Sequence, residues 1–260
     1  MKSLLPALLF ILPLPAWQQP VTLEEVLKRV QKNVAQFEAS LPDFVCSENI
    51  TSSKLSGETV SKETVIESTF TGVQKKGKDG KMEYVETREL TAVDGKKAKK
   101  GQKPKGPFLL GGGFSAVLST TFNAQMATFR NYRLEPAESL DGKKAIVVAF
   151  SSKEGQTGIG AYFNRTTFLV NDSGKAWVDP ESMQVVRLER DITNAPNPFP
   201  AWLMSVGFGP VSIGGKLFWM PKEVRSEIRR KGSDKPDRRF AAEYTNYRKF
   251  DVSSGIVSEK

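Results

Sequence analysis

The sequence predicts a mainly β protein of the α+β class. We expect one large antiparallel, strongly curved sheet or half-barrel of about ten strands, with an N-terminal helix and a short central helix. Segments in which apolar and polar residues alternate follow one another from residue 44 to the end, and most are joined by short connections rich in Gly, Asp or Pro. A sustained helical period occurs near the N-terminus. A sheet of this size must curl or close, because long flat edges promote aggregation.

Residues 1–16 have the pattern of a secretory signal peptide. Lys2 precedes an apolar run from Leu4 to Leu14, and the small residue Ala16 marks the expected cleavage point. The run is shorter than the roughly 20 apolar residues that span a bilayer. We therefore expect an exported protein, periplasmic or secreted and not membrane-spanning, with residues 17–260 forming one curled-sheet domain.

The mature chain is expected to begin with a helix. Thr22 and Glu25 have the spacing of a capping box. Apolar residues then recur at helical spacing at Leu23, Val26, Leu27, Val30, Val34 and Phe37. The Leu41-Pro42 pair ends the helix, because the residue before a proline disfavours helical geometry. One apolar face implies that this helix lies on the sheet.

The predicted strands fall into two groups around a glycine-rich break. The first group is residues 44–55, 58–74 and 81–95, and the second is residues 127–140, 143–152, 161–170, 175–179, 183–192, 216–231 and 238–250. Between them, Gly111, Gly112 and Gly113 precede a short helix expected at residues 114–120. The proline-rich residues 194–210 are too apolar for a solvated loop, so we expect them to pack on the sheet or line a pocket.

Residues 174–191 hold several acidic groups and could resemble an active site. Asp179-Pro180-Glu181-Ser182 is turn chemistry, since Asp and Pro favour the early positions of a turn. The residues after it alternate, with Val186, Leu188 and Ile192 apolar between charged neighbours. The stretch is therefore predicted to be a hairpin.

The residue inventory argues against common catalytic mechanisms. The chain has no histidine, which removes Ser-His-Asp and Cys-His chemistry and the usual zinc sites. Its one cysteine, Cys46, is predicted to be a small buried apolar residue, with a reactive or intermolecular thiol as the alternative. Carboxylates such as Glu135 and Glu138 form no convincing constellation. We expect no enzyme activity, no catalytic residues, no cofactor and no metal.

The net charge of +9 is concentrated in three loop-like segments, residues 75–81, 95–106 and 229–239. A cationic surface can attract an anionic membrane surface or an acidic envelope protein. The alternative is that these are solvated hairpin tips. Nucleic acid is not expected as a partner, because an exported chain without a binding motif offers no support for it.

The hairpin "AWVDPESMQVVRLE" resembles the W-x-D-P hairpin of the lipoprotein-carrier superfamily, the LolA/LolB-like half-barrels. The stretches "LFWMPKEVR" from Leu217 and "YTNYRKFD" from Tyr244 agree with that plan. The resemblance implies an unclosed barrel that holds apolar ligands, often acyl chains, beneath helices. The lid-locking arginine of those carriers has no assignable position in this sequence. The opening "LP-x-F-x-C" at residues 41–46 also resembles exported proteins of Acidobacteria-type soil bacteria, which implies no activity.

Together these features predict a non-enzymatic, exported binding or carrier protein for a lipid or other apolar ligand in the cell envelope. The alternative is a structural or interaction module that contacts anionic polymer, lipid or a partner protein through its cationic hairpins. The predicted cavity or lid residues are aromatic or large and apolar: Phe108, Leu110, Phe114, Phe199, Trp202, Met204, Phe208 and Trp219.

Overall fold

The computed structural model describes residues 21–76, 82–110, 116–155, 159–163, 166–192, 197 and 201–250. The predicted signal peptide lies outside these residues. The helices are α1 (Leu23–Ser40), α2 (Ala116–Phe122) and α3 (Ala124–Ala127). The strands are β1 (Phe44–Ser56), β2 (Thr59–Lys76), β3 (Met82–Val93), β4 (Lys96–Lys97), β5 (Arg130–Leu140), β6 (Lys143–Ser152), β7 (Ile159–Phe163), β8 (Thr166–Val170), β9 (Asp172–Val178), β10 (Val185–Ile192), β11 (Ala201–Ile213), β12 (Lys216–Arg229) and β13 (Pro236–Lys249).

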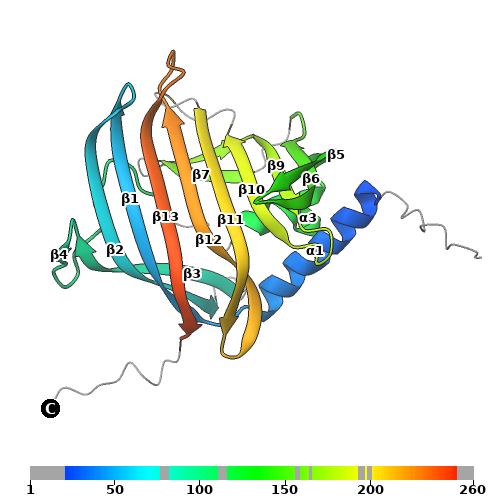
Figure 1. Ribbon diagram of the computed structural model, residues 1–260, viewed down its shortest axis with the longest axis horizontal. Helices are drawn as coiled ribbons and strands as arrows, with labels where there is room; N and C mark the ends of the chain where they lie inside the picture. The colour runs from blue at the N-terminus through cyan, green and yellow to red at the C-terminus, as the bar shows by residue number, and fades with distance from the viewer. Residues whose placement is uncertain are drawn as a thin grey trace, which may run out of the picture.

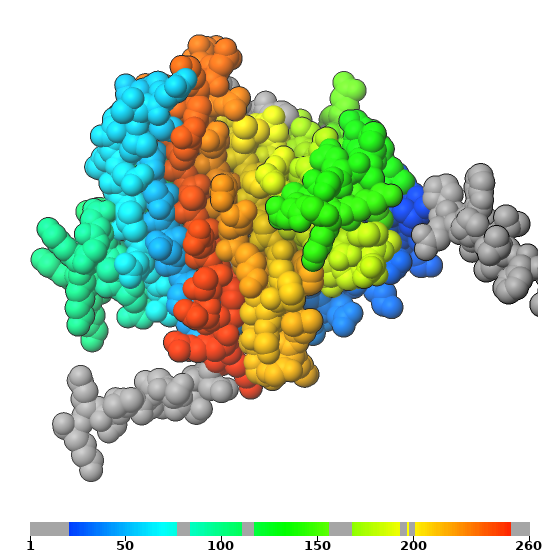
Figure 2. Space-filling model, viewed as in Figure 1, coloured from blue at the N-terminus to red at the C-terminus, as the bar shows by residue number. Residues whose placement is uncertain are grey.

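The predicted fold class is confirmed. Of the described strands, eleven form one antiparallel sheet in the order β4-β3-β2-β1-β13-β12-β11-β10-β9-β6-β5, so β4 and β5 are unjoined edges. The first and last long strands, β1 and β13, pair in the middle of the sheet. Figure 1 shows the sheet curving strongly, with α1 crossing its far side. Figure 2 shows the opposite, strand-covered face, over which the β5–β6 hairpin projects.

The N-terminal helix forms as its sequence predicts. The Thr22 side chain accepts a hydrogen bond from the backbone N–H of Glu25, which caps the first turn. The helix ends at Ser40, and its buried face consists of Val26, Val30 and Val34. These valines join the main core cluster on the inner face of the sheet, so packing rather than propensity alone holds the helix.

Two segments differ from the predicted strand pattern. Residues 161–170, expected as one strand, contribute to the separate β7–β8 hairpin. The second half of the proline-rich segment belongs to the thirteen-residue strand β11, which was not predicted from the sequence. Trp202, Met204 and Val206 do alternate there, but Gly207, Gly209 and Pro210 obscured the pattern because Gly and Pro are depleted in strands.

Candidate functional site

The inner face of the sheet brings two of the predicted ligand residues together as packed side chains. The rings of Phe108 and Trp202 meet edge to face with centroids 6.1 Å apart, and Phe108 also contacts Phe240 at 6.4 Å. The Trp202 indole Nε1 donates to Ser226 Oγ at 2.8 Å. Met204 packs against the same cluster. This part of the face is occupied by interdigitating side chains of the core.

A cover segment, residues 107–110, lies across this core and is held by polar side chains of the sheet. Ser52 Oγ donates to the carbonyl oxygen of Phe108 at 2.6 Å and accepts from its N–H at 2.9 Å. Arg238 donates to the carbonyl of Pro107 at 2.9 Å. Leu110, also a predicted site residue, is partly buried against the core. The predicted site residues Phe114 and Phe199 lie outside the described residues.

A buried ion pair occupies the inner face between β1 and β3. Arg88 donates to both carboxylate oxygens of Glu48, and Ser68 Oγ donates to Glu48 Oε2 at 2.6 Å. The Glu48 side chain is fully buried. Burial, with the Glu48 charge adding to it, raises the pKa of the neighbouring Cys46 thiol from 9.0 to about 12. Cys46 is therefore a neutral core residue, as one of the two sequence interpretations held.

A second buried charge cluster holds α2 on the other half of the sheet. Arg130 forms a bidentate ion pair with Asp172, in which Nη1 donates to Oδ1 at 2.9 Å and Nη2 donates to Oδ2 at 3.1 Å. Arg190 Nε lies 3.1 Å from Asp172 Oδ2, an ionic contact without a directed hydrogen bond. Arg190 also donates to the hydroxyls of Thr120 and Thr121, at 3.0 and 2.6 Å. Burial, only partly offset by Asp172, lowers the pKa of Arg190 to about 10.

Sequence reasoning missed both clusters, although strand alternation contained the signal. Arg190 stands between Leu188 and Ile192, and Glu48 stands between Cys46 and Ile50. Since residues two apart in a strand share a face, both charged groups belong to apolar inner rows. A charged residue in such a row indicates a buried pair, because an isolated buried charge is too costly.

The acidic hairpin at residues 174–191 is confirmed as a turn between β9 and β10. Asp179 Oδ1 accepts from the backbone N–H of Glu181 and of Ser182, at 2.8 and 3.3 Å. Backbone carbonyls of the turn also anchor the N-terminal helix. Arg29 donates to the carbonyl oxygen of Glu181 at 3.1 Å, and Asn33 donates to that of Met183 at 2.8 Å. This turn therefore has a structural role, placing α1 against the sheet.

Trp219 lies where the sheet loses its backbone pairing. The β10–β11 ladder ends at the pair of Arg187 and Gly207, whereas β11 and β12 continue together to the Ile213–Lys216 turn. The Trp219 indole Nε1 donates to the carbonyl oxygen of Val185 at 2.8 Å. Because β11 lies between β12 and β10, the indole spans β11 to make this bond. A side chain thus joins strands that the backbone leaves apart.

A cleft of about 640 Å³ opens on the outer side of this junction, and we call it the outer cleft. Its apolar lining includes Phe208 and Trp219, two of the predicted site residues, together with Val186 and Ala145. Polar groups stand at its margin, and they are Asp141, Lys143, Lys144, Asp179 and Glu181. The described residues therefore form a cleft with an apolar floor and a charged rim.

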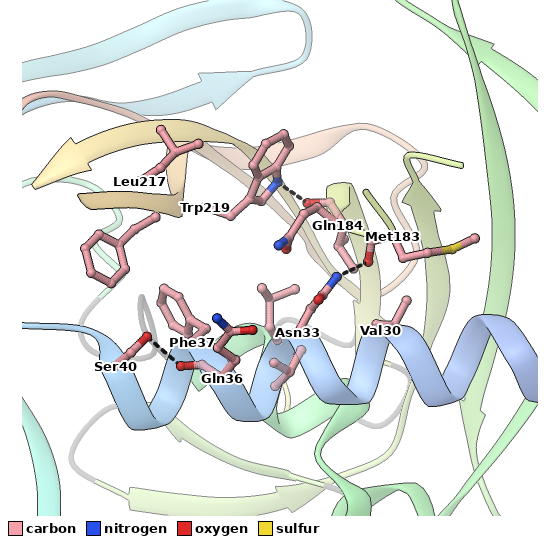
Figure 3. A pocket seen from close by; sticks show the side chains of 13 residues that line it. Val30, Asn33, Gln36, Phe37, Ser40, Met183, Gln184, Leu217 and Trp219 are labelled. Atoms are coloured by element: carbon pink, nitrogen blue, oxygen red, sulfur yellow. Dashed lines mark hydrogen bonds between the residues drawn. The ribbon is translucent and has the colours of Figure 1, made fainter. Parts of the chain in front are cut away.

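A smaller space of about 100 Å³, the helix-side cavity, lies between α1 and the β11–β12 hairpin. Figure 3 shows side chains of α1 facing Leu217 and Trp219 across it. Its lining is mixed, with Val30, Val34 and Phe37 beside Asn33 and Gln36. Trp219 forms part of the wall of this space as well.

Comparisons with known proteins give a likeness of fold. No protein-family model matches the chain, and no curated protein matches it. Solved structures with a similar chain path include a domain named for outer membrane lipoprotein sorting from Vibrio parahaemolyticus, with a TM-score of 0.47, 11% identity and coverage of 91% of this chain and 95% of that one. A LolA superfamily protein from Nitrosomonas europaea has a TM-score of 0.38 and 11% identity, with coverage of 92% of this chain and 99% of that one. A DUF1329 family protein from Desulfovibrio piger has a TM-score of 0.43 and 12% identity, with coverage of 87% of this chain and 93% of that one.

The resemblance to LolA-like proteins expected from the sequence thus recurs among solved structures. At these TM-scores it describes the path of the chain, so the function below is argued from this chain's own residues. Among the described helices, none is both long and apolar enough to cross a membrane. The described residues also contain no group of three or more His, Cys, Asp or Glu side chains arranged to hold a metal ion.

Proposed function

We propose that this protein is an exported, non-catalytic binding or carrier protein of the cell envelope, and that it takes a lipid or similar amphiphile into the outer cleft. The observation that supports this most is the cleft itself. Its volume of about 640 Å³ lies within the roughly 300–1,000 Å³ typical of small-molecule sites. Its floor is aromatic and aliphatic, which favours an apolar chain over a polar substrate.

The rim supports an amphiphile rather than a plain hydrocarbon. Lys143 and Lys144 are exposed, and neither forms an ion pair with another described residue. Asp179, in contrast, already accepts two backbone hydrogen bonds within its own turn. Asp141 and Glu181 at the same rim are exposed as well, so the rim offers groups of both signs to the polar end of an amphiphile, and its two lysines can pair with a carboxylate or phosphate end.

The predicted ligand residues on the inner face, Phe108 and Trp202, are not part of the proposed site, because core side chains fill that face. Phe108 and Trp202 are in contact with each other, and Trp202 has a hydrogen-bond partner in Ser226. An apolar chain could enter there only by separating packed rings. The outer cleft requires no such displacement, so Phe208 and Trp219 are the predicted residues that we retain for ligand contact.

The test is a titration of the purified protein with decanoate, tetradecanoate and octadecanoate, followed by calorimetry and native mass spectrometry. Val186→Trp places a large ring on the cleft floor and should weaken binding at least tenfold. Val60→Trp is the matched control, since Val60 is 48% exposed on β2 and does not line the cleft. The proposal fails if the wild-type protein takes up none of the three acids, or if both variants bind like wild type.

A second candidate function is contact with an anionic surface through the lysine loop, residues 95–106. All six of its lysines are exposed, and none forms an ion pair with another described residue. The hairpin around residues 229–239 differs, because Arg230 pairs with Asp237 at 2.9 Å and Arg239 with Glu227 at 2.8 Å. Figure 1 shows β4 and its loop projecting from one edge of the sheet.

Sedimentation with phosphatidylglycerol vesicles tests this second function. Binding that disappears in high salt and in a variant with Lys96, Lys97, Lys99 and Lys100 changed to Gln would support it, because surface charges are screened beyond about 8–10 Å at ordinary ionic strength. Equal sedimentation with neutral phosphatidylcholine vesicles would contradict it.

A further inference from the structure

The two spaces beside Trp219 lie on opposite faces of the sheet. Among the described residues, Trp219 is the one that lines both of them. Val185 lines the helix-side cavity and belongs to the main core, whereas Val186 lines the outer cleft and packs with the outer cluster. The helix-side cavity is bounded by α1, and the outer cleft is bounded by the end of the β5–β6 hairpin. Trp219 therefore stands between the outer surface and the helix-covered face.

The partition at this point is a side chain rather than a continuous backbone ladder. Pro210, which pairs with Trp219 in the β11–β12 register, has no backbone N–H to offer a neighbour. The contact across the gap is the hydrogen bond from the indole to Val185 O. Separating paired strands breaks several hydrogen bonds, but turning one indole breaks only this bond and its packing. The wall is consequently the most easily displaced part of the boundary.

Beyond the wall, the helix-side cavity offers a continuation whose mixed lining includes an apolar part. Val30 and Val34 on α1, and Leu118 on α2, line it together with Phe37. In Figure 3 the α1 side chains leave an open space below Trp219. A chain end that passed the indole would thus meet apolar side chains from two helices.

We propose that Trp219 determines the length of the alkyl chain that the protein accepts. With the indole bonded to Val185, the outer cleft ends at the indole, and this end limits the length of the chain. With the indole absent or turned away, the outer cleft and the helix-side cavity form one continuous site for a longer chain. This inference rests on the proposed function, because it concerns the depth of the same site.

The test compares affinity across the same fatty-acid series in wild type, Trp219→Phe and Trp219→Ala. Wild type should lose affinity above a limiting chain length. Trp219→Ala should move that limit upward and bind chains beyond it about tenfold more tightly for every two additional methylenes buried. Trp219→Phe, which keeps most of the wall but loses the N–H donor, should give an intermediate limit and guards against a folding defect of the alanine variant.

A second substitution provides the matched control. Gln36 is exposed on α1 and lines the helix-side cavity, so Gln36→Trp fills that space without disturbing the core. Added to Trp219→Ala, it should restore the wild-type limit. If wild type binds no acid of the series, the proposed function fails. If wild type binds with a length limit that Trp219→Ala and Trp219→Phe leave unchanged, or that Gln36→Trp does not restore, the role of Trp219 is wrong and the binding function stands.

Discussion

The inner face around Trp202 and the junction around Trp219 contain the same kinds of residue but differ in how they are filled. Trp202 contacts Phe108 and donates to Ser226 within continuous strand pairing, since β11 is paired on both sides there. Trp219 donates to Val185 where β10 and β11 have parted, and spaces lie on both sides of it. An abundance of aromatic residues therefore does not locate a cavity, whereas the end of a strand ladder does.

The same contrast holds for charged groups. The inner face encloses Asp172 between Arg130 and Arg190, all three nearly inaccessible to water. The rim of the outer cleft carries Lys143 and Lys144 in solvent. Buried charges of the first kind specify how α2 sits on the sheet, whereas exposed charges of the second kind remain available to a ligand.

The largest expected effect comes from breaking the buried cluster. Asp172→Asn leaves two buried guanidinium groups without a counter-charge, so it should lower the free energy of unfolding by about 3–5 kcal/mol. Urea unfolding followed by circular dichroism measures this. Glu189→Gln is the control: Glu189 pairs with Arg187 at a partly exposed position and should change stability by less than about 1 kcal/mol. Equal effects of the two variants would contradict a structural role for the cluster.

The two tryptophans should separate stability from binding. Trp202→Ala should cost about 2–4 kcal/mol, because this partly buried ring packs against Phe108 and two core clusters and donates to Ser226. Trp219→Ala should cost about 1–2 kcal/mol, since it removes one hydrogen bond and a half-buried ring. Thermal unfolding ranks the two by stability, and titration with decanoate, tetradecanoate and octadecanoate should show the larger change in chain-length preference for Trp219→Ala. Matching rankings in both assays would remove the distinction between the two regions.

Alkaline pH should weaken the filled region. Burial raises the pKa of Cys46 from 9.0 to about 12 and that of Tyr132 from 10.0 to about 12. Both groups ionise more readily in the unfolded chain, so their contribution to stability is complete below about pH 9 and is lost as pH rises toward 12. Urea unfolding between about pH 8 and about pH 11 should show this decline.

A cysteine variant identifies the source of the decline. Cys46→Ala removes the thiol and should reduce the pH dependence, leaving the part due to the buried tyrosines, whose pKa values burial also raises: Tyr84, Tyr132, Tyr244 and Tyr247. A decline of the same steepness in wild type and in Cys46→Ala would show that the thiol is not buried as the structure has it.

The smallest effect is expected at the rim of the outer cleft. Replacing both Lys143 and Lys144 with Ala should weaken binding of tetradecanoate severalfold at low salt and leave binding of the neutral alcohol tetradecanol unchanged. The difference should vanish at high ionic strength, since exposed charges are screened. Calorimetry at two salt concentrations measures this. Equal losses for acid and alcohol would mean that the lysines contribute through packing rather than charge.

The sequence was sufficient for those parts of the fold that depend on local pattern. Period-two alternation located most strands, and the Thr22–Glu25 spacing predicted the helix start. It was insufficient for β11, where Gly207, Gly209 and Pro210 obscure a strand that its two neighbours stabilise. The partners of Arg190 could not be predicted, because Asp172 and Thr121 approach it only through tertiary packing. The outer cleft was unpredictable for the same reason, since its lining comes from five strands and two connecting turns.

The measurement that tests the account most directly is photo-crosslinking with a tetradecanoate that carries a diazirine at its chain end, mapped to single residues by mass spectrometry. Binding in the outer cleft predicts adducts at Val186, at residues 208–210 and at Trp219. In Trp219→Ala it predicts further adducts on α1 at Val30, Val34 or Phe37. Adducts at Phe108, Trp202 and Met204 in the wild-type protein would contradict the account, because they would place the ligand within the face that the core fills.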